Sequence, residues 1–184
     1  VTIAIEQGDA ANGNLATGDL LTIYGNGGND TIDASKVTSL LLNMQFILGN
    51  DGGSILGSAN ADLIEVNVTG DTTGILNLDG RGGGDSYIVN LLGGNTETEI
   101  TINDTGTGGT DTVVVNGTTG IDRITLTGAV MTQGTNTETL NYSGLETFTV
   151  NTLGDADEVT IVSTHSGITT VNSGDGEDII AVQS

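Results

Sequence analysis

Residues 80–88 read GRGGGDSYI, a glycine-rich loop that leads through Asp85 into a run with apolar residues at alternate positions. The same arrangement recurs along the chain, so we align the sequence on each Asp that precedes such a run. Repeats in register indicate that one short supersecondary unit is stacked several times. Seven positions fit the alignment: Asp30, Asp62, Asp85, Asp111, Asp122, Asp157 and Asp178.

Apolar residues follow each Asp at the second and fourth positions, and glycine precedes most of them. Glycine stands two places before the Asp in five of the seven copies, and five places before it also in five. The unit is therefore G-x-x-G-x-D-x-φ-x-φ, where φ is apolar or aromatic, and this period of two is typical of a half-buried strand. The apolar positions are Ile32, Ile64, Tyr87, Val113, Ile124, Val159 and Ile180, then Ala34, Val66, Val89, Val115, Leu126, Ile161 and Val182.

The spacing of the copies indicates the size of one coil. Asp62 and Asp85 are 23 residues apart, and Asp85 and Asp111 are 26 apart. A coil of this length holds two or three short strands and their turns. Further strands are predicted in the gaps, at Leu20–Tyr24, Leu41–Leu48, Ile75–Asp79, Glu99–Asn103, Leu145–Asn151 and Ile168–Asn172.

These observations predict an all-β fold, a parallel β-solenoid of the β-helix or β-roll kind, with roughly eight coils at one strand spacing each. Residues 1–184 would form a single domain. Stacked coils bury a continuous apolar column, and the absence of proline preserves the hydrogen bonds between coils. A two-sheet sandwich is the alternative, but it does not account for a glycine–Asp loop that is always in the same phase.

The charge balance excludes several classes of partner. The formal net charge is -21, from 24 acidic residues against three Lys and Arg. Lys36, Arg81 and Arg123 cannot form the basic surface that nucleic acid or an anionic membrane requires. Since no apolar run approaches ~18 residues, we also expect no membrane insertion.

Stacking the coils also stacks their acidic loops. Two bare carboxylates about 4.8 Å apart repel by about 3–4 kcal/mol at an effective dielectric of about 20. Ca²⁺ would relieve this repulsion, because it binds carboxylate and carbonyl oxygens, whereas soft metals lack ligands in a chain with no Cys and one His. The alternative is that each Asp only caps a turn. We expect one common edge to hold Asp30, Asp62, Asp85, Asp111, Asp157 and Asp178.

The repeat resembles the nonapeptide G-G-x-G-x-D-x-U-x of RTX-type calcium-binding proteins. The matching stretches are GNGGNDTID (25–33), GRGGGDSYI (80–88), GTGGTDTVV (106–114), GTTGIDRIT (117–125) and SGDGEDIIA (173–181). This resemblance implies Ca²⁺ as the cofactor, bound by the loops between successive turns. The metal ligands that it implies are Asp30, Asp85, Asp111, Asp122 and Asp178, with Asp62 and Asp157 in looser loops.

The resemblance also implies a function: a calcium-stabilised structural or adhesive module of a secreted bacterial surface or extracellular-matrix protein. Both ends of the sequence read as strands, VTIAI and DIIAV, and an open solenoid end can pair with another chain. We therefore expect the domain to belong to a larger assembly, a filament or a surface lattice. Its expected partners are calcium ions, copies of itself or flanking repeats, and surface glycans.

A β-helix enzyme acting on acidic polysaccharide, such as a lyase or epimerase, is the alternative function. Such a site needs basic side chains that neutralise uronate groups, and the chain has only three. No nucleophile and base stand out as a pair. We therefore expect that the chain is not an enzyme.

Overall fold

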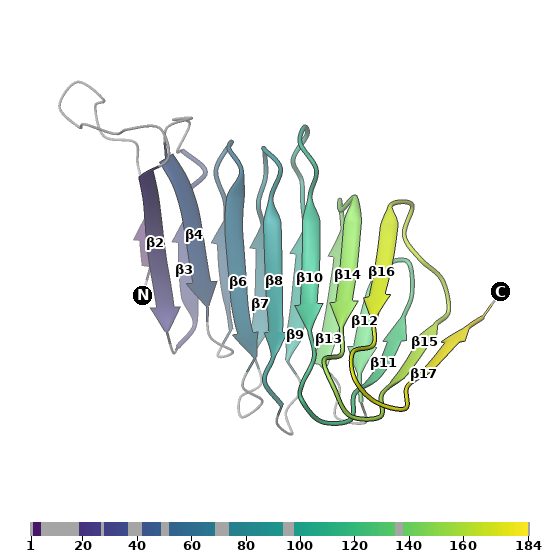
Figure 1. Cartoon of the computed structure of the whole chain (residues 1–184). Coiled ribbons are helices and arrows are strands. Elements are labelled where there is room, and N and C mark those ends of the chain that lie inside the picture. The colour runs from purple at the N-terminus through teal and green to yellow at the C-terminus, as the bar shows by residue number, and fades with distance from the viewer. Residues whose placement is uncertain are drawn as a thin grey trace.

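The computed structural model describes residues 2–4, 19–26, 28–36, 42–48, 52–68, 74–93, 98–134 and 138–183. Over these ranges the chain alternates between two facing sheets and advances along one axis, so that it forms an all-β, largely parallel solenoid (Figure 1). The predicted fold class is confirmed. No helix long and apolar enough to cross a membrane occurs in the described ranges.

One sheet, here called sheet B, has seven strands in the part of the chain that the structure describes, and all are parallel to their neighbours. Successive strands pair in sequence order, as expected when each coil contributes one strand. They are β2 (Asp19–Asn26), β4 (Leu42–Leu48), β6 (Asp62–Val68), β8 (Ser86–Leu91), β10 (Thr112–Asn116), β14 (Thr147–Asn151) and β16 (Ile168–Asn172).

The facing sheet, sheet A, has ten strands in the described ranges and is less regular. It runs in the order β1-β3-β5-β7-β9-β13-β12-β11-β15-β17. The strands are β1 (Thr2–Ala4), β3 (Asp30–Asp33), β5 (Gly53–Leu56), β7 (Ile75–Asp79), β9 (Glu99–Asn103), β11 (Arg123–Leu126), β12 (Val130–Gln133), β13 (Glu138–Ser143), β15 (Glu158–Ile161) and β17 (Ile179–Val182).

The coil between β10 and β14 carries an insertion that the repeat did not predict. β12 is antiparallel to both β11 and β13, so the three strands form a meander inside an otherwise parallel sheet. Thr112 pairs with Thr147, which places Glu146 one coil beyond Asp111. This single coil therefore takes 35 residues, and the interval from Asp111 to Asp157 is not two regular coils.

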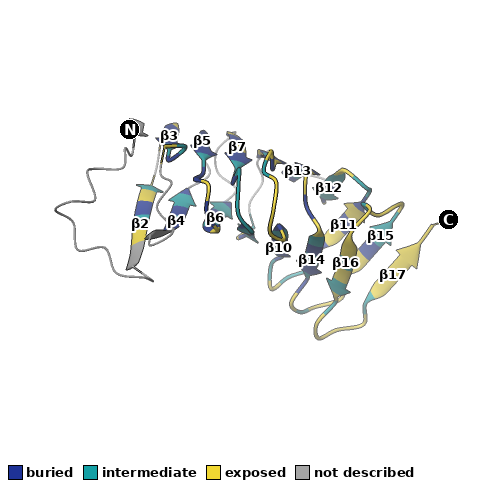
Figure 2. Ribbon diagram, turned by 90° about the horizontal axis from the view of Figure 1, so that it is seen from above, coloured by how far each residue is buried: buried dark blue, intermediate teal, exposed yellow. Residues whose placement is uncertain are grey.

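The apolar column lies between the two sheets. The inward positions of the middle coils are buried, as Figure 2 shows by the alternation of dark blue along their strands. Tyr87 and Phe148 are 1% and 0% exposed, so both are core residues. Ile180 and Val182 are exposed, because β17 has a neighbour on one side only in the described part of sheet A.

An asparagine ladder runs across the outer face of sheet B, at the ends of five neighbouring strands. Four amide nitrogens each donate to the amide oxygen of the preceding coil, over 2.8–2.9 Å. Because the three inner amides both donate and accept, the ladder fixes the register from coil to coil. Its members are Asn67, Asn90, Asn116, Asn151 and Asn172.

Candidate metal centre

The aligned Asp residues do not share one edge, and that part of the sequence prediction is wrong. We call the edge at which the sheet B strands begin the upper edge, and the edge at which β11, β15 and β17 begin the lower edge. A coil has two strands and two edges, so an interval of half a coil, such as the 11 residues from Asp111 to Asp122, moves the motif to the opposite edge.

The upper ladder consists of Asp62, Asp85, Asp111 and Glu146, each just before or at the start of a sheet B strand. The backbone N–H of Asp62 donates to Asp85 Oδ1, and that of Asp85 donates to Asp111 Oδ1, both over 2.7 Å. The backbone N–H of Asp111 donates to Glu146 Oε2 over 2.7 Å. The carboxylates of Asp85, Asp111 and Glu146 thus each accept a charge-assisted hydrogen bond from the preceding coil.

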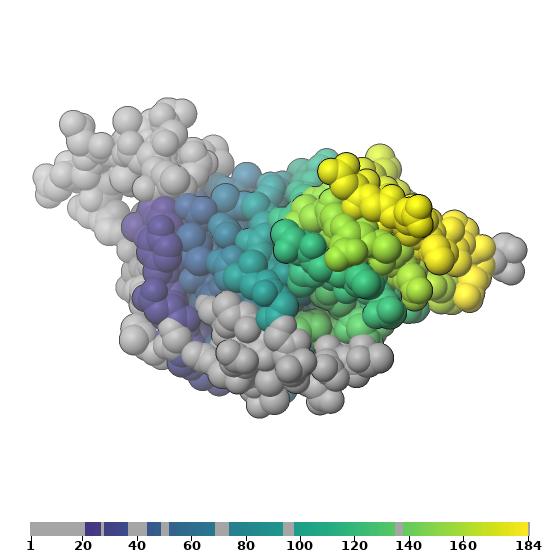
Figure 3. Space-filling model, turned by 60° about the horizontal axis from the view of Figure 1, so that its bottom comes forward, coloured from purple at the N-terminus to yellow at the C-terminus, as the bar shows by residue number. Residues whose placement is uncertain are grey.

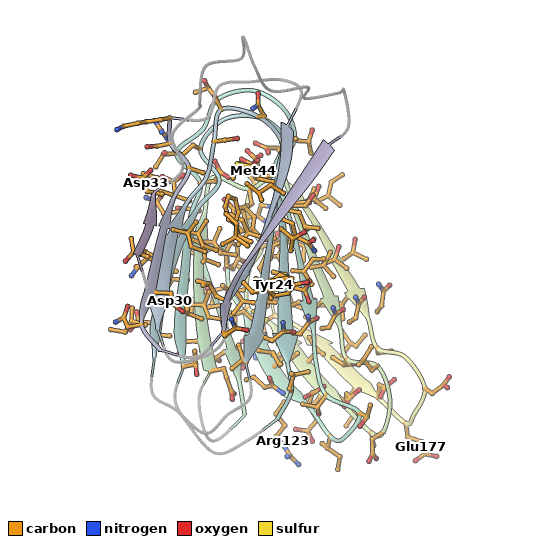
Figure 4. All side chains as sticks on the ribbon, turned by 90° about the vertical axis from the view of Figure 1, so that its left-hand side faces the viewer. Tyr24, Asp30, Asp33, Met44, Arg123 and Glu177 are labelled. Atoms are coloured by element: carbon orange, nitrogen blue, oxygen red, sulfur yellow. The ribbon has the colours of Figure 1, made fainter. Side chains whose placement is uncertain are left out.

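The lower ladder consists of Asp122, Asp157 and Asp178. The backbone N–H of Asp122 donates to Asp157 Oδ1 over 2.8 Å, and that of Asp157 donates to Asp178 Oδ1 over 3.0 Å. Figure 4 shows the two edges apart: Met44, which pairs with Asp62, lies near the top, and Arg123 lies near the bottom. Figure 3 brings the lower edge forward, with the coils following one another from purple to yellow.

Asp30 belongs to neither ladder. It opens β3 in sheet A, where its register partner in the next coil is Gly53, a residue without a side chain. Its own side chain is buried, with 2% of its surface exposed. Whether Asp30 and the six Asp of the two ladders bind metal stays a prediction of the sequence.

Two of the loops show how the Asp also organises its own turn. Asp62 Oδ2 accepts the backbone N–H of Ser58 over 2.6 Å, and Asp122 Oδ2 accepts that of Thr118 over 3.0 Å. The hydroxyl of each residue donates to the other oxygen of the same Asp. The capping role weighed as an alternative is therefore present, and it operates together with the ladders.

The glycine five places before the Asp serves close packing. A Cβ on Gly80 would lie 2.4 Å from Asp85 Oδ2, and one on Gly57 would lie 2.8 Å from Asp62 Oδ2. By contrast Gly83, two places before Asp85, has a φ of 118°, which is the conformation that favours glycine. The two glycines of the motif are therefore required for different reasons: Gly80 because a side chain would overlap Asp85, and Gly83 because its φ is positive.

This difference predicts the effect of adding one methyl group to the loop. Gly80→Ala should lower the free energy of unfolding by about 2 kcal/mol, because the new Cβ overlaps the buried carboxylate. Gly82→Ala is the matched control in the same loop, where the nearest atom would be 3.5 Å away and φ is unremarkable. Urea unfolding of both variants measures the difference, and equal midpoints would contradict the packing role of Gly80.

Three carboxylates gather at the upper edge: Asp85, Asp104 and Asp111. One oxygen from each lies within 4.8 Å of the others, and the side chains are 0%, 7% and 6% exposed. Asp104 follows β9 on the opposite sheet and reaches across to the ladder. It is held there by the Tyr87 hydroxyl, which donates to Asp104 Oδ2 over 2.6 Å, and by the backbone N–H of Gly106.

The environment of the cluster disfavours three negative charges. Burial, together with the charges of Asp62, Asp104 and Asp111, raises the pKa of Asp85 to about 7. Burial also raises the pKa of Asp104 and of Asp111. At this separation each ionised pair costs about 3–4 kcal/mol at an effective dielectric of about 20. The three groups therefore need protons or a cation between them.

The donor set suits a hard cation. Carboxylate oxygens are what Ca²⁺ and Mg²⁺ prefer, and the cluster offers neither nitrogen nor sulfur. Asp85 Oδ2 is buried and has no hydrogen-bond partner, so one lone-pair-bearing oxygen of the cluster is available to a ligand. The two arginines make their contacts elsewhere than at this cluster. Arg81 donates to the Ser35 carbonyl oxygen, and Arg123 forms an ion pair with Glu158.

Two residues of this site did not emerge from the sequence alignment. Glu146 has the signature of the repeat, with Gly144 two places before it and Phe148 and Val150 after it, but it carries Glu in place of Asp. Accepting Glu at that position would have found it. Asp104 has no such signal, because it lies at the end of a strand and meets the ladder only through the fold.

Comparison with known proteins adds no assignment. A scan against protein-family models, a search of curated proteins and a search of solved structures each found no match.

Proposed function

We propose that this chain is a calcium-stabilised structural or adhesive module of a secreted bacterial surface or extracellular-matrix protein. The observation that carries the proposal is the Asp85–Asp104–Asp111 cluster, three buried carboxylates within 4.8 Å of one another. A cation there joins two successive coils, because Asp85 lies in the loop between β7 and β8, and Asp104 and Asp111 both lie in the loop between β9 and β10. Binding to the folded state alone stabilises that state by mass action.

Calcium is the ion that we propose, because of the shape of the site and the charge of the chain. Ca²⁺ accepts irregular coordination by oxygens, whereas Mg²⁺ requires a near-octahedral arrangement and gives up water reluctantly. Weak sites of the extracellular kind, with dissociation constants of about 10⁻⁴–10⁻³ M, fill outside cells and not in a calcium-poor cytoplasm. A net charge of -21 raises the local cation concentration further.

We propose that the module lengthens an assembly, through contacts with flanking repeats or with copies of itself. This is supported by β17, in which every residue is exposed, including Ile179 at 60% and Val182 at 72%. Such an edge offers unpaired backbone groups and apolar side chains to a further strand. Surface glycans are proposed as the target of adhesion.

Thermal unfolding followed by circular dichroism tests the calcium proposal. At 10 mM Ca²⁺ and a dissociation constant of about 10⁻⁴ M, the folded state gains about 2.7 kcal/mol. For a chain of this size the thermal midpoint should rise by about 5–10 °C relative to EDTA. Mg²⁺ at the same concentration is the control and should give a smaller rise. Equal midpoints in Ca²⁺ and EDTA would contradict the proposal.

A further inference from the structure

The coil formed by β16 and β17 presents a surface of the same kind as the contacts between coils. Each of these strands has a neighbour on one side only in the described residues. In the inward row of sheet A, Val159 is 1% exposed, whereas its register partner Ile180 is 45% exposed, and Val182 is exposed as well. Inward apolar side chains are thus left uncovered, because each coil of a solenoid is buried by its neighbours.

The backbone of β17 also offers hydrogen bonds at this surface. The N–H groups of Ile179 and Gln183 donate to carbonyl oxygens of the preceding coil, both over 2.8 Å. Because alternate residues of a parallel strand direct their N–H groups to opposite neighbours, those of Ile180 and Val182 point to the open edge. These two amides therefore report whether a further strand is added.

The asparagine ladder and the lower ladder both reach this surface, and each has a direction. In the asparagine ladder an amide nitrogen donates to the preceding coil, as Asn172 does to Asn151 over 2.8 Å, so the next bond would end on the Asn172 oxygen. In the lower ladder a backbone N–H donates to the carboxylate of the following coil, so the next donor is the N–H of Asp178. A coil that continues both ladders must bring an amide nitrogen to the first place and a carboxylate to the second.

The coils that carry both ladders share a sequence pattern, N-x₅-D, in which Asn ends a strand of sheet B and Asp directly precedes the next strand of sheet A. The pairs are Asn116 and Asp122, Asn151 and Asp157, and Asn172 and Asp178. Between the last two of these coils, both strand pairs and both ladder bonds are offset by 21 residues. The surface therefore has the register of a regular 21-residue coil.

We propose that this surface binds one more coil of the same repeat, with 21 residues, apolar inward side chains and an N-x₅-D pair that continues both ladders. The assignment rests on the proposed function, and of the two contacts allowed there it selects a flanking repeat. The interface between coils already present in the chain would simply continue. A second copy docked through the same face would repeat the groups of Asn172 and Asp178 without complementing them, and would bring a further net charge of -21.

Adding one coil to the full chain tests the assignment. A second copy of residues 164–184, appended to the chain, places the copied Asn and Asp 21 residues beyond Asn172 and Asp178. We expect the thermal midpoint to rise by about 5 °C or more, because each coil is stabilised by its nearest neighbours. Hydrogen exchange at the amides of Ile180 and Val182 should slow about tenfold or more, because both amides gain acceptors.

The matched control is the same extension with Asn172→Ala and Asp178→Ala made in the added copy only. It should lose most of the rise in midpoint and most of the slowed exchange, because only its apolar residues still match the surface. An added coil that changes neither the midpoint nor the exchange of β17 would overturn the proposal. Equal gains from the two extensions would overturn the requirement for the N-x₅-D pair.

Sedimentation velocity of the unextended chain tests the competing occupant. Oligomers in which exchange at Ile180 and Val182 is slowed would assign the surface to a second copy and would also overturn the proposal. All measurements are made both in EDTA and in 10 mM Ca²⁺, so that the two proposals can fail separately. A midpoint of the unextended chain that rises with Ca²⁺, with no gain from the added coil, would leave the calcium-stabilised module standing without this partner.

Discussion

Asp85→Asn should stabilise the calcium-free protein at pH 8 and, at the same time, abolish most of its response to Ca²⁺. Asn has nearly the shape of Asp, and its Oδ1 can still accept the backbone N–H of Asp62, so the ladder is retained. The substitution removes one of three mutually repelling charges, since Asp104 and Asp111 remain. It also removes Asp85 Oδ2, the buried carboxylate oxygen that has no hydrogen-bond partner.

The size of both effects follows from charge and linkage. Removing one of the three charges takes away two repulsive pairs of about 3–4 kcal/mol each at an effective dielectric of about 20, partly relieved by protons in the native protein. The rise of about 5–10 °C in the thermal midpoint with 10 mM Ca²⁺ should fall to about 2 °C or less.

Asp175→Asn is the matched control, because Asp175 is an exposed loop residue outside both ladders. It should leave the response to Ca²⁺ intact. An Asp85→Asn protein that is less stable than the native protein without Ca²⁺, and that gains as much as the native protein on adding it, would show that Asp85 is only a hydrogen-bond acceptor.

The second large effect is an unusual dependence of stability on pH. Without calcium, the protein should be most stable near pH 4 and should lose stability as the pH rises to about 8. Burial raises the pKa of Asp62 and of Asp122 to about 6, and that of Asp85 to about 7. An unfolded Asp has a pKa of about 3.9.

The sign follows from proton linkage. Between about pH 4 and pH 7 the folded state binds more protons than the unfolded state, so stability falls as pH rises, and the loss is complete above the folded pKa values. At about 1.4 kcal/mol for each unit of pKa difference, three such groups make the loss on the order of several kcal/mol. Repulsion within a chain of net charge -21 acts in the same direction.

Urea unfolding at a series of pH values measures this dependence. With 10 mM Ca²⁺ the part of the loss that comes from Asp85 should be cancelled above pH 6, because the ion binds the ionised form of that carboxylate, whereas the part that comes from Asp62 and Asp122 should remain. Asp85→Asn should give a shallower curve without Ca²⁺. Stability that rises from pH 4 to pH 8 in EDTA would mean that these carboxyls are ionised and well stabilised in the folded protein.

The sequence was sufficient to predict the repeated strand and its inward residues. A period of two is a direct consequence of the pleat, so Ile64, Val89 and Val115 could be assigned to the core from spacing alone. The glycine–Asp loop could be assigned to a turn between strands, because its glycines directly precede an alternating apolar run. These features depend on residues that are near in the chain.

The arrangement of the loops in space could not be predicted in the same way. Spacing does not distinguish a motif on one edge from the same motif half a coil later, and the β12 insertion changed the phase between Asp111 and Asp157. Asp104 joins the cluster from the facing sheet. It is held there by a hydrogen bond from Tyr87, which no local sequence pattern predicts. Sites that span two sheets depend on the fold of several coils together.

A crystal structure of the protein grown with 10 mM Ca²⁺ at pH 8 is the most direct measurement of the central claim. We predict an ion at the upper edge with oxygens of Asp85, Asp104 and Asp111 about 2.3–2.6 Å away, the distance range of Ca²⁺ coordination. An anomalous signal at the calcium position identifies it. Three carboxyl groups that hydrogen-bond only to one another or to water, with no ion between them at saturating Ca²⁺, would contradict the claim.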